Sequence, residues 1–359
     1  MFENNEEMRA IDERKNGKQI SQDEHSRSRV SFAVKNLSNE MKLTLLDKLE
    51  VDGVIKLVQS NKTFRQTVFA EPWRVFGKEF AMIRVSKHSL EVQKAANMET
   101  LYYNADFPIW RFVQRLQFGK LLEVICPECD DRLSPALDAC CRRCHRQDPN
   151  FDLHKIFPQL KQIDKLRVHL HYKTFKKLFA NFQAQVISST SLSLHDMEIP
   201  PTKQPEIFDS FSNNSLKFCE KIELNCWNDD QYELYREALV KTRVKLVHIV
   251  LWRDIYRQIV ESLKSKGVAG ANPQASALLF EEYGHLWGVL DLFHSLPEII
   301  DSKEILYEKA KEDYQKCNKT CADIVKYRFF RQSDNRGGEC LWMIPWESSY
   351  GLFVKRFQD

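Results

Sequence analysis

Glycine and proline are scarce in this 359-residue chain, which holds 11 and 12 of them. Their scarcity excludes collagen-like and low-complexity chains, which are rich in both. An excess of one charge is also lacking, because 53 Lys and Arg face 50 Asp and Glu for a formal net charge of +3. A protein that wraps nucleic acid with its whole surface carries a larger basic excess, so any such binding must come from a local patch.

Long apolar runs are absent as well. No stretch supplies the roughly 18 or more apolar residues that a membrane span needs, and residues 1–36 lack the apolar core of a secretory signal. We therefore expect no membrane partner and a cytoplasmic or nuclear location. The 43 % of hydrophobic residues still suffices for a packed core. Residues 1–35, dominated by charged and small polar side chains, predict a flexible tail.

Residues 36–82 carry apolar side chains at helical spacing. The pattern is interrupted after residue 49 and again at Asn61, and Pro72 removes a backbone donor. These breaks predict three short helices, at about 40–49, 53–60 and 62–69. Four of the apolar residues follow one another at intervals of four: Leu37, Met41, Leu45 and Leu49.

The same segment resembles the F-box, whose pattern opens with Leu-Pro-x-Glu and later holds Val-Ser-Lys-x-Trp/Phe-Arg. Here the first part is Leu37-Ser38-Asn39-Glu40 and the later part is Ser60-Asn61-Lys62-Thr63-Phe64-Arg65, with no gap in the spacing. Ser38 stands where Pro is usual, and Ser60 where Val is usual. The resemblance implies that the contacts to an adaptor come from Leu37, Glu40, Leu45, Leu49, Val54, Leu57 and Phe64.

The resemblance also implies a non-catalytic role in protein degradation. An F-box docks on a Skp-family adaptor and so joins a cullin ubiquitin ligase, while the rest of the chain selects a substrate protein, here unknown. The sequence contains no G-x-S-x-G, Walker A, G-x-G-x-x-G or H-E-x-x-H motif. We therefore predict that the chain is a subunit of a ligase complex and not itself an enzyme.

Half of the ten cysteines are concentrated in residues 126–144. They include two C-x2-C pairs with eleven residues between them. Each pair can direct two thiolates at one ion, and four thiolates close a tetrahedral sphere, so the pattern predicts one structural Zn²⁺. The predicted ligands are Cys126, Cys129, Cys141 and Cys144.

Neighbouring residues leave some alternatives open. Cys140 could replace the first thiol of the second pair, and His145 could replace its last. Arg142, Arg143 and Arg146 add positive charge, which makes a zinc-ribbon nucleic-acid-binding protein the alternative function. Because nearby aspartates can neutralise these arginines, we do not expect nucleic acid as a partner.

Strand-like and helix-like runs alternate in the second half of the chain. Strand-like runs begin near residues 166, 192, 222 and 246, at intervals of 24 to 30 residues. This interval is close to the roughly 20–29 residues of a leucine-rich repeat. An ordinary parallel α/β sheet fits the same alternation. Residues 276–294 are predicted to be helical, and the last 30 or so residues predict a β-hairpin or meander.

Histidines on these strands raise a third hypothesis, a metalloenzyme. His169 and His171 alternate along one strand and therefore face the same side, and His195 and His248 on later strands could join them. No acidic ligand stands out near a strand end, so a binding face is the favoured interpretation.

Together these observations predict an α+β multi-domain fold. Its parts would be an N-terminal three-helix F-box-like unit, a small zinc knuckle and a C-terminal repetitive, leucine-rich-repeat-like α/β domain. The expected domains are a flexible tail (1–35), an F-box-like helical domain (36–82), a helical connector (83–125), a four-cysteine zinc knuckle (126–149) and a repeat-like substrate domain ending in a β-hairpin (150–359).

Overall fold

The structure is a computed structural model, in which the chain divides into two compact units with the main boundary after residue 77. In the described part, no helix is long and apolar enough to span a membrane. The described residues are 37–71, 79–86, 89–96, 100–104, 116–125, 157–195, 205–251, 255–281, 290–299, 310, 312–314, 327–333, 339–345 and 351–357.

The first unit contains three short helices. Two of them begin at side-chain caps: the Ser38 hydroxyl accepts from the Met41 N–H at 3.2 Å, and the Asn61 side chain accepts from the Thr63 and Phe64 N–H groups. Apolar side chains from all three helices are buried together, among them Leu46, Val54, Ile55, Val58, Phe64 and Val68. The helices are α2 (Asn39–Lys48), α3 (Val51–Ser60) and α4 (Lys62–Ala70).

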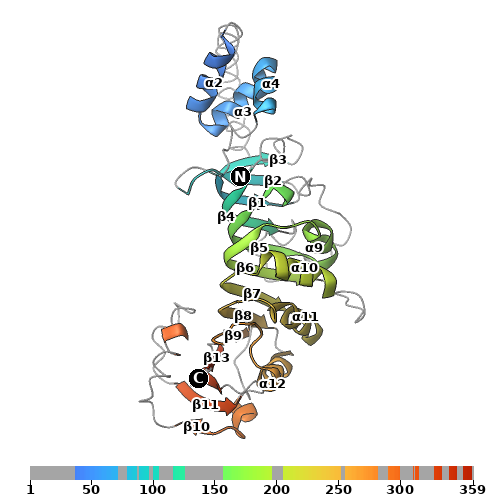
Figure 1. Ribbon diagram of the computed structural model, residues 1–359, viewed down its shortest axis with the longest axis vertical. Coiled ribbons are helices and arrows are strands. Elements are labelled where there is room, and N and C mark those ends of the chain that lie inside the picture. Colours follow the sequence, from blue (N-terminus) through green and yellow to red (C-terminus); the bar gives the residue numbers. More distant parts are fainter. Residues whose placement is uncertain are drawn as a thin grey trace, which may run out of the picture. The chain divides into compact units, whose positions relative to one another are not determined.

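The second unit is built on one mixed sheet of 13 strands, in the order β10-β11-β12-β13-β9-β8-β7-β6-β5-β4-β1-β2-β3 (Figure 1). Seven neighbouring strands, from β9 to β1, are parallel, and the remaining strands pair antiparallel at the two ends. The strands are β1 (Glu79–Val85), β2 (Ser89–Gln93), β3 (Leu101–Asn104), β4 (Phe118–Ile125), β5 (Gln162–His171), β6 (Gln185–His195), β7 (Lys221–Cys226), β8 (Leu246–Leu251), β9 (Ser276–Glu281), β10 (Glu298–Ile299), β11 (Tyr327–Ser333), β12 (Glu339–Pro345) and β13 (Leu352–Phe357).

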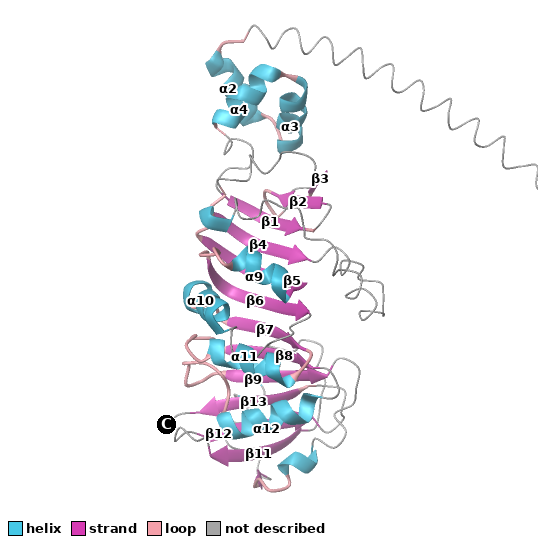
Figure 2. Cartoon of the chain, turned by 90° about the vertical axis from the view of Figure 1, so that its right-hand side faces the viewer, coloured by secondary structure: helices cyan, strands magenta, loops and turns pink. Residues whose placement is uncertain are grey.

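Four helices follow the central parallel strands and lie along one face of the sheet (Figure 2). Strand residues that alternate along β7, β8 and β9 point at them, since Leu224, Ile249 and Ala277 line a small apolar cavity together with Tyr232 and Leu263 of the helices. The opposite face of β7 and β8, which continues over β4 to β6, is called the open face below; on β9 that face is covered, since Leu278 is buried there in an apolar cluster with Tyr314 and Phe353. The helices are α9 (Tyr172–Phe179), α10 (Pro205–Ser215), α11 (Asp229–Leu239) and α12 (Tyr256–Lys266), with short 3-10 turns η2 (Phe157–Gln159) and η4 (Leu290–Phe293).

A cluster of phenylalanines packs α9 and α10 onto the sheet. Its rings lie 4.7 to 6.0 Å apart between centroids. Aromatic pairs at such distances contribute about 0.5–1.5 kcal/mol each beyond their buried area. The cluster is Phe157, Phe175, Phe179, Phe182, Phe208 and Phe211, all of them buried.

The predicted α+β multi-domain fold class is wrong, because a single 13-stranded mixed sheet forms the core of the chain. The predicted helical connector at 83–125 holds strands β2, β3 and β4, which join the same sheet as β5 to β9. The leucine-rich-repeat-like domain is therefore not a separate body. The last three strands do not form an isolated hairpin either, since β13 pairs with β9.

The error has a physical cause. Residues 79–85 and 118–125 are largely apolar runs of seven and eight residues. Runs of this length cannot be assigned to helix or strand by periodicity alone. The same ambiguity affected residues 276–281, predicted as helix, which form β9 in the middle of the sheet.

Candidate functional site

The apolar residues spaced four apart on α2 are not its buried face. Leu46 is the buried leucine of this helix, with 1 % of its surface exposed, whereas Met41 is 57 % exposed. Leu37, Leu45 and Leu49 are half-buried. We call Met41 and Leu45 on the helix, together with Leu37 before its N-cap and Leu49 at its C-cap, the α2 ridge.

The other predicted adaptor contacts fall into two groups. Glu40 is exposed and Leu57 is half-buried, so both can reach a partner. Val54 and Phe64 are 1 % and 0 % exposed, which places them in the core of the helical unit. Their effect on a partner can only be indirect, through support of the surface above them.

The open face of the sheet carries a row of charged and polar side chains that the sequence did not reveal. Arg84 lies between two carboxylates, with Nη1 3.0 Å from Glu91 Oε2 and Nε 2.6 Å from Glu123 Oε2. The other oxygen of Glu123 is 3.8 Å from Arg167 Nη1. We call this row, defined by the strand register, the charged row: Glu91, Arg84, Glu123, Arg167, Ser191, Glu223 and His248.

Glu223 is the fixed negative charge of this row on β7. His248 Nδ1 lies 3.2 Å from its Oε2, and the Ser191 hydroxyl donates to its Oε1 at 2.9 Å. The hydrogen bond with His248 is the main cause that lowers the pKa of Glu223 to about 2, against the opposing effect of burial. Glu223 is therefore ionised at neutral pH and already has its partners.

Three of the four histidines singled out in the sequence come together at the carboxyl ends of β5 and β6. His169 Nε2 and His195 Nε2 are 2.8 Å apart, so one ring donates and the other accepts. The His195 ring centre also lies 6.2 Å from that of His171 and 5.0 Å from that of Trp227. His248 does not join them, because it pairs with the β7 carboxylate.

The histidine cluster does not form a complete set of metal ligands in the described part of the chain. Among the described residues, no group of three or more His, Cys, Asp or Glu side chains is placed to hold a metal ion. The histidine cluster is instead a packed polar edge of the open face.

The predicted zinc ligands lie outside the described residues. Cys126, Cys129, Cys141 and Cys144, together with the alternative Cys140, therefore stay a prediction. The cysteines that the structure describes are Cys219, Cys226 and Cys340, which are buried and form no disulfide. Burial raises the pKa of Cys219 to about 11, which disfavours the reactive thiolate.

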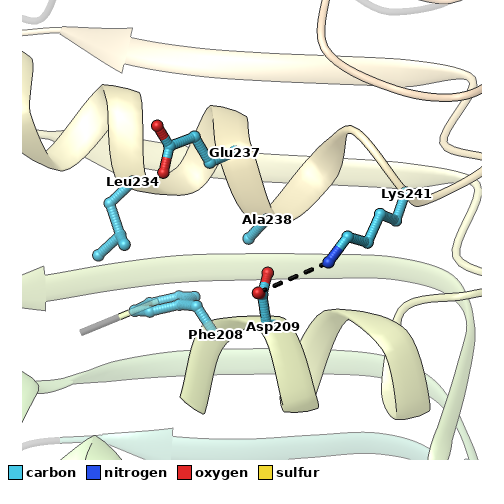
Figure 3. Close-up of a pocket in the computed structure, with 6 residues that line it drawn as sticks. All are labelled: Phe208, Asp209, Leu234, Glu237, Ala238 and Lys241. Atoms are coloured by element: carbon cyan, nitrogen blue, oxygen red, sulfur yellow. Dashed lines mark ion pairs between the residues drawn. The ribbon is translucent and has the colours of Figure 1, made fainter. Parts of the chain in front are cut away.

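A shallow groove separates α10 from α11 on the helical face of the sheet (Figure 3). It is crossed by an ion pair, with Lys241 Nζ 3.6 Å from Asp209 Oδ2. Both side chains are well exposed, so the pair stabilises the packing of the helices by at most about 1 kcal/mol. The groove is lined by Phe208, Asp209, Leu234, Glu237, Ala238 and Lys241.

Comparisons with known proteins add no further constraint. No family model matches the chain, and neither the curated proteins nor the solved structures contain a match.

Proposed function

We propose that the chain is an F-box-type substrate receptor, which links a target protein to a Skp–cullin ubiquitin ligase without catalysing a reaction itself. The α2 ridge is the observation that carries the proposal. Single exposed apolar residues are common on protein surfaces. Here Met41, 57 % exposed, and Leu45 lie one turn apart on α2, with Leu37 just before its N-cap and Leu49 at its C-cap, and such apolar anchors are those by which a helix docks in an apolar groove.

The surroundings of the ridge support the same interpretation. Glu40 is exposed beside it, and the buried side chains beneath it, including Leu46 and Phe64, provide a packed base. The second unit supplies a broad open face with polar and charged side chains, which suits recognition of a substrate protein. The two units would thus divide the tasks of coupling and selection.

Co-purification with a Skp-family adaptor tests the proposal. The full chain should retain the adaptor, and a Leu45→Asp/Leu49→Asp variant should lose it, because each carboxylate would be buried without a partner at the interface. A Gln59→Asp/Gln66→Asp variant is the matched control, since it adds the same charge at exposed positions of the other two helices. The proposal fails if the wild-type chain ignores the adaptor or if the ridge variant binds like the control.

We further propose that the four-cysteine cluster binds one structural zinc ion. The support is the duplicated C-x2-C spacing. Elemental analysis of the purified chain should give about one zinc per molecule. A Cys126→Ser/Cys129→Ser variant should lose the metal, and retention of a full equivalent would contradict the assignment.

A further inference from the structure

A second row of side chains crosses the open face, one step towards the amino ends of the strands from the charged row. The register pairs these residues across five neighbouring strands from β4 to β8. Cationic side chains flank a serine, and leucines stand at both ends. We call Leu121, Lys165, Ser189, Lys221 and Leu246 the basic row.

The basic row holds cations that no carboxylate contacts directly in the described part of the chain. Lys165 is exposed and Lys221 half-buried, and neither ammonium group forms an ion pair or a hydrogen bond there. They belong to β5 and β7, so their backbones are about 9–10 Å apart, with Ser189 on the strand between them. The Ser189 hydroxyl also makes no hydrogen bond among the described residues.

Arg167 adds a third positive charge near Ser189. It follows Lys165 on the same face of β5, and its side chain is 58 % exposed. Its contact with Glu123, at 3.8 Å, is loose, because that carboxylate is held more closely by Arg84 at 2.6 Å. Three cationic groups therefore surround the short side chain of Ser189.

The nearby carboxylates do not neutralise the lysines of the basic row. Glu223, the nearest on β7, feels the charge of Lys221 only at longer range and is already bound by the His248 ring and the Ser191 hydroxyl. Further along β6, the Ser193 hydroxyl faces the same side and is 4 % exposed with no hydrogen-bond partner in the described residues. The serine side of β6 thus has hydroxyl groups without a hydrogen-bond partner among the described residues.

We infer that the basic row binds an acidic segment of the substrate protein, with a carboxylate seated over Ser189 between Lys165 and Lys221. This inference rests on the proposed function and adds the substrate class to it. The half-buried Leu121 favours an apolar residue at one end of the acidic ones, and at the other end Leu246, itself half-buried, borders the apolar cluster around Leu278. The row spans about four strand spacings, or roughly 19 Å, which an extended segment of about six residues covers.

A nucleic acid fits this face less well than a peptide. A phosphate chain needs a continuous track of cations. Here the basic row ends in leucine on both sides, and the adjoining charged row contains two carboxylates, the buried Glu123 and the half-buried Glu223. The limited positive area matches two or three carboxylates of a peptide.

A peptide titration on the purified full chain, without adaptor, tests the inference. The probe is a fluorescein-labelled hexapeptide, Leu-Glu-Asp-Glu-Asp-Leu, and the control peptide has Gln and Asn in place of Glu and Asp. The acidic peptide should bind at least roughly ten-fold more tightly at low salt, and the preference should shrink as salt is added, because exposed ion pairs are screened.

Two variants and their control locate the site. Lys165→Glu/Lys221→Glu should weaken binding of the acidic peptide by roughly ten-fold or more, whereas Lys173→Glu/Lys176→Glu, the same charge change on exposed positions of α9, should not. Ser189→Asp should also abolish binding, since its own carboxylate would lie between the two lysines. Circular dichroism and thermal unfolding confirm that each variant is folded.

The outcomes separate this inference from the proposed function. Selective peptide binding that depends on Lys165 and Lys221 supports the site even if the adaptor does not bind. Equal binding of both peptides, or unchanged binding by the folded basic-row variant and by Ser189→Asp, overturns it. Tighter binding of a single-stranded RNA oligonucleotide that is lost in the same variants would also overturn it in favour of nucleic acid.

Discussion

A comparison of Met41→Ala with Leu46→Ala separates docking from packing on α2. The two residues are five positions apart on one helix, yet Met41 is 57 % exposed and Leu46 is 1 % exposed. Burying a whole Met or Leu side chain is worth about 1.5–3 kcal/mol. If the adaptor covers the exposed part of Met41, its removal should cost 57 % of that figure, or about 0.9–1.7 kcal/mol of binding free energy.

This cost corresponds to an adaptor affinity about five- to eighteen-fold weaker for Met41→Ala. The stability of the helical unit should hardly change, because the side chain packs little and Ala is the best helix former. Leu46→Ala should do the opposite. It opens a cavity in the core and should cost about 2–5 kcal/mol of unfolding free energy.

Two measurements on the full chain distinguish a loss of adaptor binding from a loss of helix stability. Calorimetric titration with the adaptor reports affinity, and hydrogen–deuterium exchange over residues 39–70 reports the local stability of α2 to α4. Met41 is not a docking residue if Met41→Ala leaves the adaptor affinity unchanged, and it belongs to the core if Met41→Ala speeds exchange as much as Leu46→Ala does.

Three further predictions concern the sheet unit. Because Glu223 has a pKa of about 2 in place of 4.5, its stabilising effect is complete above pH 4.5 and is lost as the pH falls towards 2. Glu223→Gln should therefore lower the unfolding free energy by about 1 kcal/mol in urea at pH 7, and by progressively less in acid. A difference in stability that stays constant with pH would contradict this. Gly351→Ala would place a Cβ 2.1 Å from the Leu279 carbonyl oxygen and should lower the unfolding free energy by about 3 kcal/mol in denaturant titration; a neutral result would show that β13 does not approach β9 as closely. Burial raises the pKa of Glu233, but hydrogen bonds from Lys266, Ser262 and Arg236 lower it to about 2. Because these bonds link α11 to α12, Glu233→Gln should speed amide hydrogen exchange in α12. Unchanged exchange would argue against this link.

The local pattern predicted some elements well. The breaks at Leu49 and Asn61 separate α2, α3 and α4, and the Asn61 side chain caps the last of them. The strand-like runs after residue 160 correspond to β5 to β8, each with a helix after it. These segments have clear periodicity and local caps, which a single sequence displays directly.

The features that the sequence could not show depend on pairing between segments that are far apart in the chain. The pairing of β13 with β9, and of β1 with β4, joins segments that no local pattern relates. The charged row and the basic row depend on the same registers, since a slip of one residue would turn every side chain to the other face. The α2 ridge was visible as spacing, but only packing shows that Leu46, rather than Leu45, is the buried neighbour.

The place of β13 has a consequence for biosynthesis. This strand, residues 352–357, lies between β9 and β12 and alone connects β10, β11 and β12 to the parallel strands. Until β13 has emerged from the ribosome, the backbone edge of β9 lacks this neighbour, and an unpaired edge favours pairing with other chains. A nascent or truncated chain that stops before Leu352 should therefore depend on chaperones and aggregate readily, whereas a chain that includes β13 closes that edge of β9.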